Sequence, residues 1–464
     1  MPAEMRRVRL HDTRSGGLVE LAPRTPGWVS IYACGPTVYG RIHVGNARPF
    51  VLFSLLKRFL EHEGYEVTLV ANITDVNDKI YDAARAARRP SAELAAQMAD
   101  AYRADTDALE LGRPDHEPLA SDTMAAIIDY IATLVDSGHA YAAGGDVYFR
   151  VRSDPAYGSL SHRRLEDMDQ GEGVEGAERK EEAVDFALWK AHKPGEDTSW
   201  DSPWGRGRPG WHIECSAMAE QLLGVGFDIH GGGSDLVFPH HENEAAQTRA
   251  ARGAELARLW VHNGMIQLTG EKMAKSLGNI APLHEVLEEH GRDAVIMYLI
   301  SGHYRQPLAF SAAELQDAER GVRRVRDALR RMRAGRPSPP ELAHHSEAFF
   351  DALASDFNTP AALDALFKWV RDANAASDRG EEVGDGGLRE MLSVLGLEKL
   401  APLRSAADLA TSDPEAMGLL AERERARERR EFARADRLRA ELRARGYEIR
   451  DGPEGSELIP AHER

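Results

Sequence analysis

The chain has 464 residues, a formal net charge of −17 and two cysteines. That length supports about two to four domains, and the two cysteines exclude a disulfide scaffold and a zinc-finger array. The acidic balance argues against a general nucleic-acid coat but leaves room for a local basic face. Residues 1–26 contain no apolar signal-peptide core, and the apolar runs are too short to cross a membrane. We therefore expect a soluble, cytoplasmic protein that does not associate with membranes.

The first part of the chain has the pattern of a parallel α/β unit. Residues 28–34 and 66–73 are apolar runs that favour strands, and the amphipathic residues 50–60 between them predict a helix. The sequence His43-Val44-Gly45-Asn46 lies where the first strand passes into that helix. Because helix N-termini attract phosphate, we interpret this segment as one half of a nucleotide-binding site.

The middle of the chain predicts an insertion, after which the sheet continues. Residues 105 to about 210 are less regular, with a hairpin candidate at 144–150 and a glycine-containing stretch at 171–176 that we expect to be mobile. Further strands are predicted at 227–230, 259–262 and 265–268. We assign residues 1–310 to one Rossmann-like catalytic domain that includes the insertion.

Two lysines stand in one short loop, Lys272-Met273-Ala274-Lys275-Ser276, in the part of the catalytic domain that spans about 265–310. A compact ammonium charge suits triphosphate oxygens that move during a reaction. We interpret Lys272 and Lys275 as the second half of the nucleotide site. The alternative is an ordinary solvated surface loop.

Beyond Phe310 the pattern becomes helical. Ser311 and Glu314 have capping-box spacing, and Thr359-Pro360 predicts a second helix with threonine as its N-cap. We assign 311–411 to a helical bundle and 412–464 to a small basic C-terminal module that ends in a short strand and turn. The fold class is therefore α/β, with a Rossmann-like parallel-sheet core, an insertion, a helical bundle and a small C-terminal module.

The densest group of ligand-type residues is His240-His241-Glu242-Asn243-Glu244. If this segment is helical, His240 and Glu244 lie one turn apart on the same face. Together with Cys34 and Cys215 they have the right chemistry for tetrahedral zinc. The HExxH pattern of metalloproteases is absent, which disfavours hydrolytic zinc. The alternative is a hydrogen-bonded polar cluster without a metal.

A glycine run, His230-Gly231-Gly232-Gly233-Ser234-Asp235, follows one of the predicted strands. Consecutive glycines allow the backbone to approach a flat base or a sugar closely. The same residues also suit an ordinary tight turn, so both interpretations stay open here.

Over nearly its full length the chain resembles the cysteinyl-tRNA synthetase family of class I aminoacyl-tRNA synthetases. The resemblance rests on Cys34-Gly35-Pro36-Thr37-Val38-Tyr39, on His43 to Asn46, on Trp211-His212-Ile213-Glu214-Cys215-Ser216, on His230 to Glu244 and on the lysine loop. It implies zinc held by Cys34, Cys215, His240 and Glu244. It implies catalytic roles for His43, Asn46, Lys272 and Lys275. It implies ATP contacts from Thr37, His43, Gly45, Asn46, Gly232, Asp235, Lys272 and Lys275, and contacts to the amino acid from Trp211 and His230.

Four positions depart from the family pattern. Ala274 replaces the serine that is usual in the lysine loop. Val44 and Asn46 replace the isoleucine and the final histidine of the family's His-Ile-Gly-His (HIGH) motif, and Asn77 stands where a second aspartate is common. Loss of the serine hydroxyl removes one phosphate contact, typically worth about 0.5 to 1.5 kcal/mol. We expect loop closure to be altered but not abolished.

The resemblance implies that L-cysteine reacts with ATP, accompanied by Mg²⁺, to form cysteinyl-adenylate, and that cysteine then passes to tRNA(Cys). It also implies a monomer, one Zn²⁺ in each chain and an anticodon-binding role for the basic C-terminal module. One alternative is the related ligase that joins cysteine to an amino sugar in mycothiol synthesis. A second alternative is a synthetase-like protein that only binds RNA.

Overall fold

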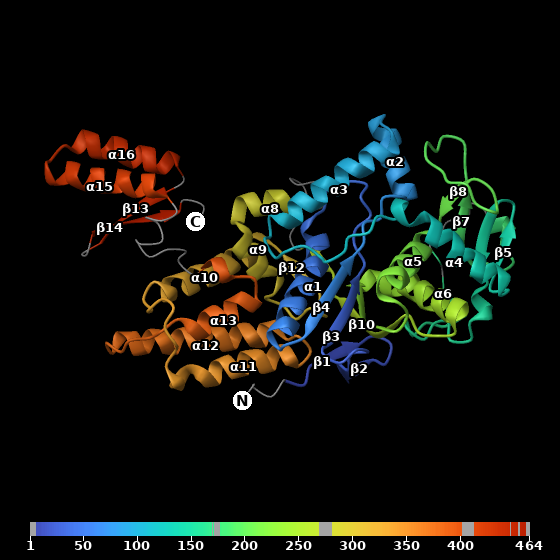
Figure 1. The fold of residues 1–464 in the computed structure, drawn as a ribbon, viewed down its shortest axis with the longest axis horizontal. Coiled ribbons are helices and arrows are strands. Elements are labelled where there is room, and N and C mark those ends of the chain that lie inside the picture. The colour runs from blue at the N-terminus through green and yellow to red at the C-terminus, as the bar shows by residue number, and fades with distance from the viewer. Residues whose placement is uncertain are drawn as a thin grey trace.

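The computed structural model describes residues 6–168, 170, 177–268, 281–400, 413–445, 447–452 and 455–460. Its centre is a four-stranded parallel sheet of order β10-β9-β3-β4 (Figure 1). The strands are β3 (Trp28–Ala33), β4 (Glu66–Ala71), β9 (Phe227–Gly233) and β10 (Ala257–Asn263). The structure confirms the predicted fold class and places four of the five predicted strands in this sheet, whereas the strand predicted at 265–268 belongs to a separate two-stranded pair.

Helices cover both faces of this sheet, which is why its strands are almost continuously apolar. On β3, Val29 and Ile31 belong to the same buried cluster as Phe53 of α1 (Val44–His62). Tyr32 points the other way and is buried in a cluster with residues of α5 (Trp211–Leu223) and α6 (Glu242–Arg252). The segments that carry the predicted metal ligands thus lie on the α5 and α6 face.

An antiparallel hairpin that the sequence analysis did not predict precedes the core. It consists of β1 (Arg9–Asp12) and β2 (Gly17–Glu20), and Asp12 accepts a hydrogen bond from the backbone N–H of Trp260 in β10 (2.9 Å). The hairpin is too short and too polar to show a clear alternation in sequence.

The insertion has a sheet of its own, of order β5-β6-β7-β8 and entirely antiparallel. The predicted hairpin at 144–150 is confirmed as β5–β6, with Gly144 and Gly145 at positive φ in its turn. The glycine stretch 171–176 lies outside the described residues. Between β4 and α5 the elements are α2 (Asp78–Ala87), α3 (Ser91–Asp107), η1 (Ser121–Thr123), α4 (Met124–Asp136), β5 (Ala140–Ala143), β6 (Asp146–Phe149), η2 (Val151–Ser153), η3 (Leu165–Asp167), η4 (Ala177–Arg179), β7 (Phe186–Ala191) and β8 (Gly207–Pro209).

After β10 the chain forms a second small parallel pair and then a set of helices. The elements are β11 (Ile266–Leu268), α8 (Leu283–His290), α9 (Arg292–Leu299), β12 (Leu308–Phe310), α10 (Ala312–Leu329), α11 (Ala343–Ala354), α12 (Thr359–Asp378) and α13 (Gly386–Val394). Ser311 caps α10 as predicted, since its hydroxyl accepts from the Glu314 N–H at 3.3 Å. The predicted cap of α12 is wrong by one residue. Asn358 accepts from the Ala361 N–H, and Thr359 is already helical, because asparagine is at least as good an N-cap as threonine.

The C-terminal residues form a compact unit (Figure 1). Its elements are α15 (Pro414–Glu428), α16 (Phe432–Ala444), β13 (Tyr447–Gly452) and β14 (Gly455–Pro460), and the two strands pair antiparallel. The strand predicted near Tyr447 is therefore one arm of a hairpin. The domain boundaries at 310/311 and 411/412 stay predictions. Among the described residues, no helix has the length and apolar character needed to span a membrane.

A charge cluster lies where α1 packs against the helical bundle. The His62 ring lies 3.2 Å from a Glu63 carboxylate oxygen through Nδ1 and 3.0 Å from a Glu390 oxygen through Nε2. It also stacks on Phe350 with a centroid separation of 4.2 Å. Hydrogen bonds to Glu390 and Glu63 raise the pKa of His62 to about 9.

This raised pKa makes stability depend on pH in a defined direction. The His62 contribution is fully present below the unfolded pKa of about 6.5 and is lost as pH rises through about 9. Because the side chain is partly exposed to solvent, we expect about 1 kcal/mol. Thermal unfolding midpoints of the protein and of His62→Gln should differ at pH 6 and converge near pH 9.5. An equal difference at both pH values would contradict this role.

Candidate functional site

Two thiols meet at the carboxyl end of the central sheet. Cys34 directly follows β3, where its N–H donates to the Gly231 carbonyl at 2.9 Å, and Cys215 lies in the second turn of α5. Both are free and buried, and their sulfurs are 3.8 Å apart although 181 positions separate them in the chain.

His240 and Glu244 complete the group. Nε2 of His240 lies 3.1 Å from Oε1 of Glu244, and the Cys34 sulfur lies 3.8 Å from the same oxygen. Nδ1 of His240 is occupied by His212 at 2.9 Å, so Nε2 is the nitrogen that faces the carboxylate. One ligand atom from each of Cys34, Cys215, His240 and Glu244 lies within 4.8 Å of every other.

These separations fit the edges of a zinc tetrahedron. Zn–S bonds of about 2.3 Å at tetrahedral angles separate two sulfurs by about 3.8 Å, the distance between Cys34 and Cys215. Zn–N and Zn–O bonds of about 2.0 to 2.2 Å separate nitrogen and oxygen by about 3.4 Å, against 3.1 Å between His240 and Glu244. The residues present therefore fit the metal that the sequence predicts, and the assignment of zinc itself stays a prediction.

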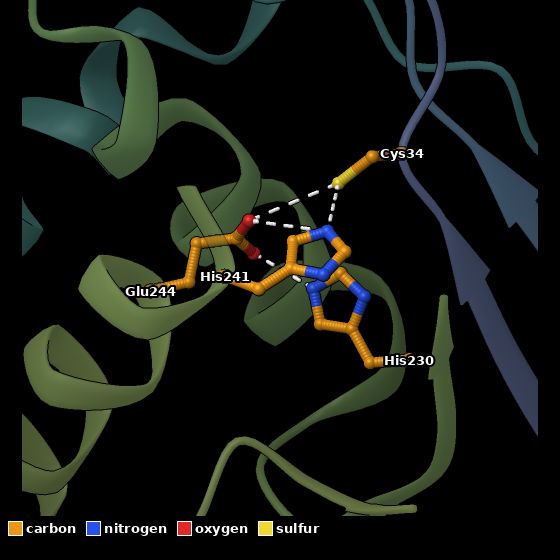
Figure 2. A group of neighbouring side chains, drawn as sticks. All are labelled: Cys34, His230, His241 and Glu244. Atoms are coloured by element: carbon orange, nitrogen blue, oxygen red, sulfur yellow. Dashed lines mark hydrogen bonds and ion pairs between the residues drawn. The ribbon is translucent and has the colours of Figure 1, made fainter. Parts of the chain in front are cut away.

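A second ligand group shares two of these residues. Cys34, His230, His241 and Glu244 also place one ligand atom each within 4.8 Å of one another (Figure 2). Nε2 of His241 lies 3.3 Å from the Cys34 sulfur, and Nε2 of His230 lies 2.8 Å from Oε2 of Glu244. His230 is predicted from the sequence to contact the amino acid, and His241 carries no predicted role, although its position beside His240 was a visible signal.

Burial controls the electrostatics of these side chains. It raises the pKa of the Cys34 thiol well above its usual range and raises the pKa of Glu244 to about 7. It lowers the pKa values of His230 and His240 to about 3, so both imidazoles are neutral and retain a lone pair. Metal centres typically combine neutral imidazoles with thiols and a carboxyl group. The thiols and the carboxyl group lose their protons when a divalent cation binds.

The segment His43 to Asn46 forms the start of α1. The His43 side chain is the N-cap, because its Nδ1 accepts from the Gly45 N–H at 3.1 Å, while Asn46 Oδ1 accepts from the His43 N–H at 3.2 Å. This capping box leaves the ring proton of His43 on Nε2, as assigned from the hydrogen bond. A Cβ at Gly45 would lie 2.9 Å from the His43 ring, which explains the glycine.

Residues that follow the lysine loop pair with this same segment. The Val44 N–H donates to the Ala281 carbonyl at 3.1 Å, and the Leu283 N–H donates to the Ile42 carbonyl at 3.0 Å. Residues 281–283, which come after the lysine loop in the chain, therefore lie against the start of α1, although more than two hundred positions separate them from it. Lys272 and Lys275 themselves lie outside the described residues, and their roles stay predictions.

The other predicted contact residues surround this edge of the sheet. Trp211 stacks on His240 with ring centroids 4.3 Å apart, and Thr37 pairs with Thr74 beyond the end of β4. Gly232 is buried at the end of β9, and Asp235 is exposed in η5 (Ser234–Leu236), just before η6 (Val237–His241). The glycine run has a packing reason at Gly231, where a Cβ would lie 2.0 Å from the Phe53 ring.

Three family models match the chain. The model of the tRNA synthetases class I (C) catalytic domain matches residues 20–320, the DALR domain matches 348–399, and the cysteinyl-tRNA ligase anticodon binding domain matches 411–457. A cysteine–tRNA ligase of Halorhodospira halophila is 45% identical over 458 residues, which cover 97% of this chain and 98% of the relative. One of Alkalilimnicola ehrlichii is 45% identical over 457 residues, 97% of this chain and 99% of the relative.

Solved structures of more distant proteins share the fold. Mycobacterium tuberculosis methionyl-tRNA synthetase in complex with methionyl-adenylate has a TM-score of 0.58 at 17% identity, covering 84% of this chain and 92% of that one. The leucyl-tRNA synthetase of Agrobacterium radiobacter, in a ternary complex, has a TM-score of 0.60 at 13% identity and covers 85% of this chain and 86% of that one. At such identities the likeness concerns the fold alone.

Proposed function

The chain belongs to the cysteine–tRNA ligases, a family of class I aminoacyl-tRNA synthetases, and we propose that it forms cysteinyl-adenylate from L-cysteine and ATP before charging tRNA(Cys), with zinc selecting the thiol. The observation that carries the proposal is the arrangement at one sheet edge. Four metal-type donors converge there within 4.8 Å, on the same edge as the capped start of α1.

The first step is attack of the cysteine carboxylate on the α-phosphorus of ATP, with pyrophosphate leaving. His43 presents a neutral Nε2–H donor at the start of α1, where the positive end of the helix dipole also lies, so negative charge that develops on phosphate is stabilised there. Lys272 and Lys275 are proposed to bind the remaining phosphate oxygens, and Mg²⁺ enters with ATP. In the second step, a ribose hydroxyl of the terminal adenosine of tRNA attacks the carbonyl carbon of cysteinyl-adenylate, an ester bond forms and AMP leaves.

Selectivity requires a distinction between cysteine and serine, whose side chains differ little in size. Zinc bound by Cys34, Cys215, His240 and Glu244 would supply a borderline Lewis acid that binds a thiolate far better than a hydroxyl group. Trp211 stacks on His240 and restricts the space around that ring. We propose that this discrimination makes a separate editing site unnecessary.

The C-terminal unit favours RNA as the acceptor over a small amino sugar. Its two helices and the residues that flank them carry a series of exposed arginines, namely Arg425, Arg427, Arg429, Arg430, Arg434, Arg437, Arg439, Arg443 and Arg445. Some of them pair with glutamates, as Arg434 does with Glu422 at 3.5 Å, so the face is mixed rather than uniformly basic. A ligase for a small sugar has no use for such a face.

The test is aminoacylation of purified tRNA(Cys) with cysteine and with serine, together with metal analysis of the same preparation. We expect about one zinc for each chain and a preference for cysteine of at least about a thousandfold in kcat/KM. Comparable charging with serine, or full activity without bound metal, would contradict the proposal.

A further inference from the structure

An exposed tyrosine and a lysine lie together beside the site. The Tyr39 side chain is 48% exposed, and Nζ of Lys79 lies 5.6 Å from its ring centroid. In the described part of the chain, Phe432 is the one other aromatic side chain that is exposed. Lys79 has no ion pair with any described residue, whereas the neighbouring Lys190 is paired with Asp78 at 3.0 Å. The pair thus presents an aromatic face and an unneutralised ammonium group to solvent.

The backbone on either side of Tyr39 and Lys79 is fixed by hydrogen bonds. The loop before Tyr39 pairs with the segment after β4, because the Val38 N–H donates to the Thr74 carbonyl and the Thr74 N–H donates to Pro36, both at 3.1 Å. Val38 itself is fully buried. The exposure of the Tyr39 ring is therefore a property of a fixed loop.

The backbone at Lys79 is fixed by the cap of α2 and by the two flanking residues. Asn77 caps α2 by accepting from the Lys79 N–H at 3.0 Å, so the asparagine that replaces the usual aspartate keeps the capping function. Asp78 pairs with Arg208 of the insertion sheet, and Ile80 is buried. The start of α2 is thereby fixed between the core and the insertion.

The pair lies at the edge where the donor groups gather. Tyr39 follows the end of β3 and Lys79 follows the end of β4, and these parallel strands end in register at Ala33 and Ala71. Tyr39 is five residues beyond Cys34, so its backbone lies within about 18 Å of that residue. The 48% exposure of Tyr39 leaves part of its side chain accessible at this edge.

We propose that Tyr39 and Lys79 bind the unpaired 3′ end of tRNA, with a base stacked on the free face of the Tyr39 ring and the adjoining phosphate paired with Lys79. An aromatic face beside a free cation is the arrangement that binds single-stranded nucleic acid. The inference rests on the proposed function, because the 3′-terminal adenosine must reach an adenylate formed at this edge. The pair binds the transfer substrate and has no part in adenylate formation.

The test compares two half-reactions in the full-length protein. Tyr39→Leu removes the ring, and Tyr39→Phe is the matched control that keeps it. For Tyr39→Leu we expect single-turnover transfer from preformed cysteinyl-adenylate to tRNA to fall roughly tenfold, with cysteine-dependent pyrophosphate exchange within about twofold of the unchanged protein. Tyr39→Phe should retain both rates. Lys79→Gln should weaken tRNA binding and reduce its dependence on salt.

A binding measurement tests the contact directly. The unchanged protein should bind intact tRNA(Cys) more tightly than tRNA that lacks its unpaired 3′ nucleotides, and Tyr39→Leu should bind the two equally. A preference retained in Tyr39→Leu, or a parallel loss of exchange and transfer in that variant, would overturn the inference while leaving the proposed function intact. Absence of cysteine-dependent exchange in the unchanged protein would overturn the proposed function and this inference with it.

Discussion

Replacing Cys215 with serine is expected to abolish stoichiometric zinc binding and to lower cysteine-dependent pyrophosphate exchange at least about a hundredfold. The change removes one of two sulfurs that lie 3.8 Å apart and leaves a hydroxyl group, which does not ionise near neutral pH. Outer-shell changes alone typically cost about 10- to 100-fold in metal affinity, so loss of a direct ligand should cost more. The measurements are metal content after purification, zinc affinity by competition with a chelator, and exchange.

A matched variant distinguishes the two possible ligand groups. His241 belongs only to the group that lacks Cys215, and its Nδ1 is bound to His262 Nε2 at 2.7 Å. If Cys34, Cys215, His240 and Glu244 hold the metal, His241→Gln should keep one zinc in each chain and lose affinity by at most about 100-fold. If His241→Gln loses the metal while Cys215→Ser keeps it, the alternative group is the correct one.

Replacing His43 with alanine is expected to lower the exchange rate about 100- to 1,000-fold, the usual effect of removing one hydrogen-bond donor from a developing negative charge. In the folded protein the Gly45 N–H occupies Nδ1, so the ring proton lies on Nε2, the atom proposed to donate to phosphate. Burial lowers the pKa of His43, which keeps this donor neutral at pH 7. Exchange should be measured at saturating ATP and cysteine, together with the thermal unfolding midpoint.

His43→Asn separates the two functions of this residue. Asparagine is a good N-cap and should preserve the start of α1, whereas alanine costs about 1 kcal/mol of helix stability there. We therefore expect His43→Asn to unfold near the midpoint of the unchanged protein and still to lose exchange. Recovery of exchange in His43→Asn would show that the imidazole serves only as a cap.

Local patterns in the sequence predicted most elements of the core. The strands near residues 28, 66, 227 and 259 were recognisable because a parallel sheet covered on both faces requires continuous apolar runs. Ser311 was recognisable because capping is a contact between residues three positions apart. The hairpin β1–β2 and the strand β14 were missed, since short polar strands carry little periodicity and are stabilised by their partners.

The chemistry of the site was determined by residue type, and its geometry by tertiary structure. Two cysteines in a long chain, with a histidine and a glutamate one helical turn apart, had the right chemistry for zinc but left a metal-free polar cluster open, and the family resemblance implied the four ligands. That Cys34 and Cys215 come within 3.8 Å depends on how α5 packs against the end of β3, a contact across 181 positions that no local pattern encodes. His241 joins the site for the same reason. His240 contacts Trp211 of α5 and His241 contacts His262 of β10, because η6 passes between these two elements.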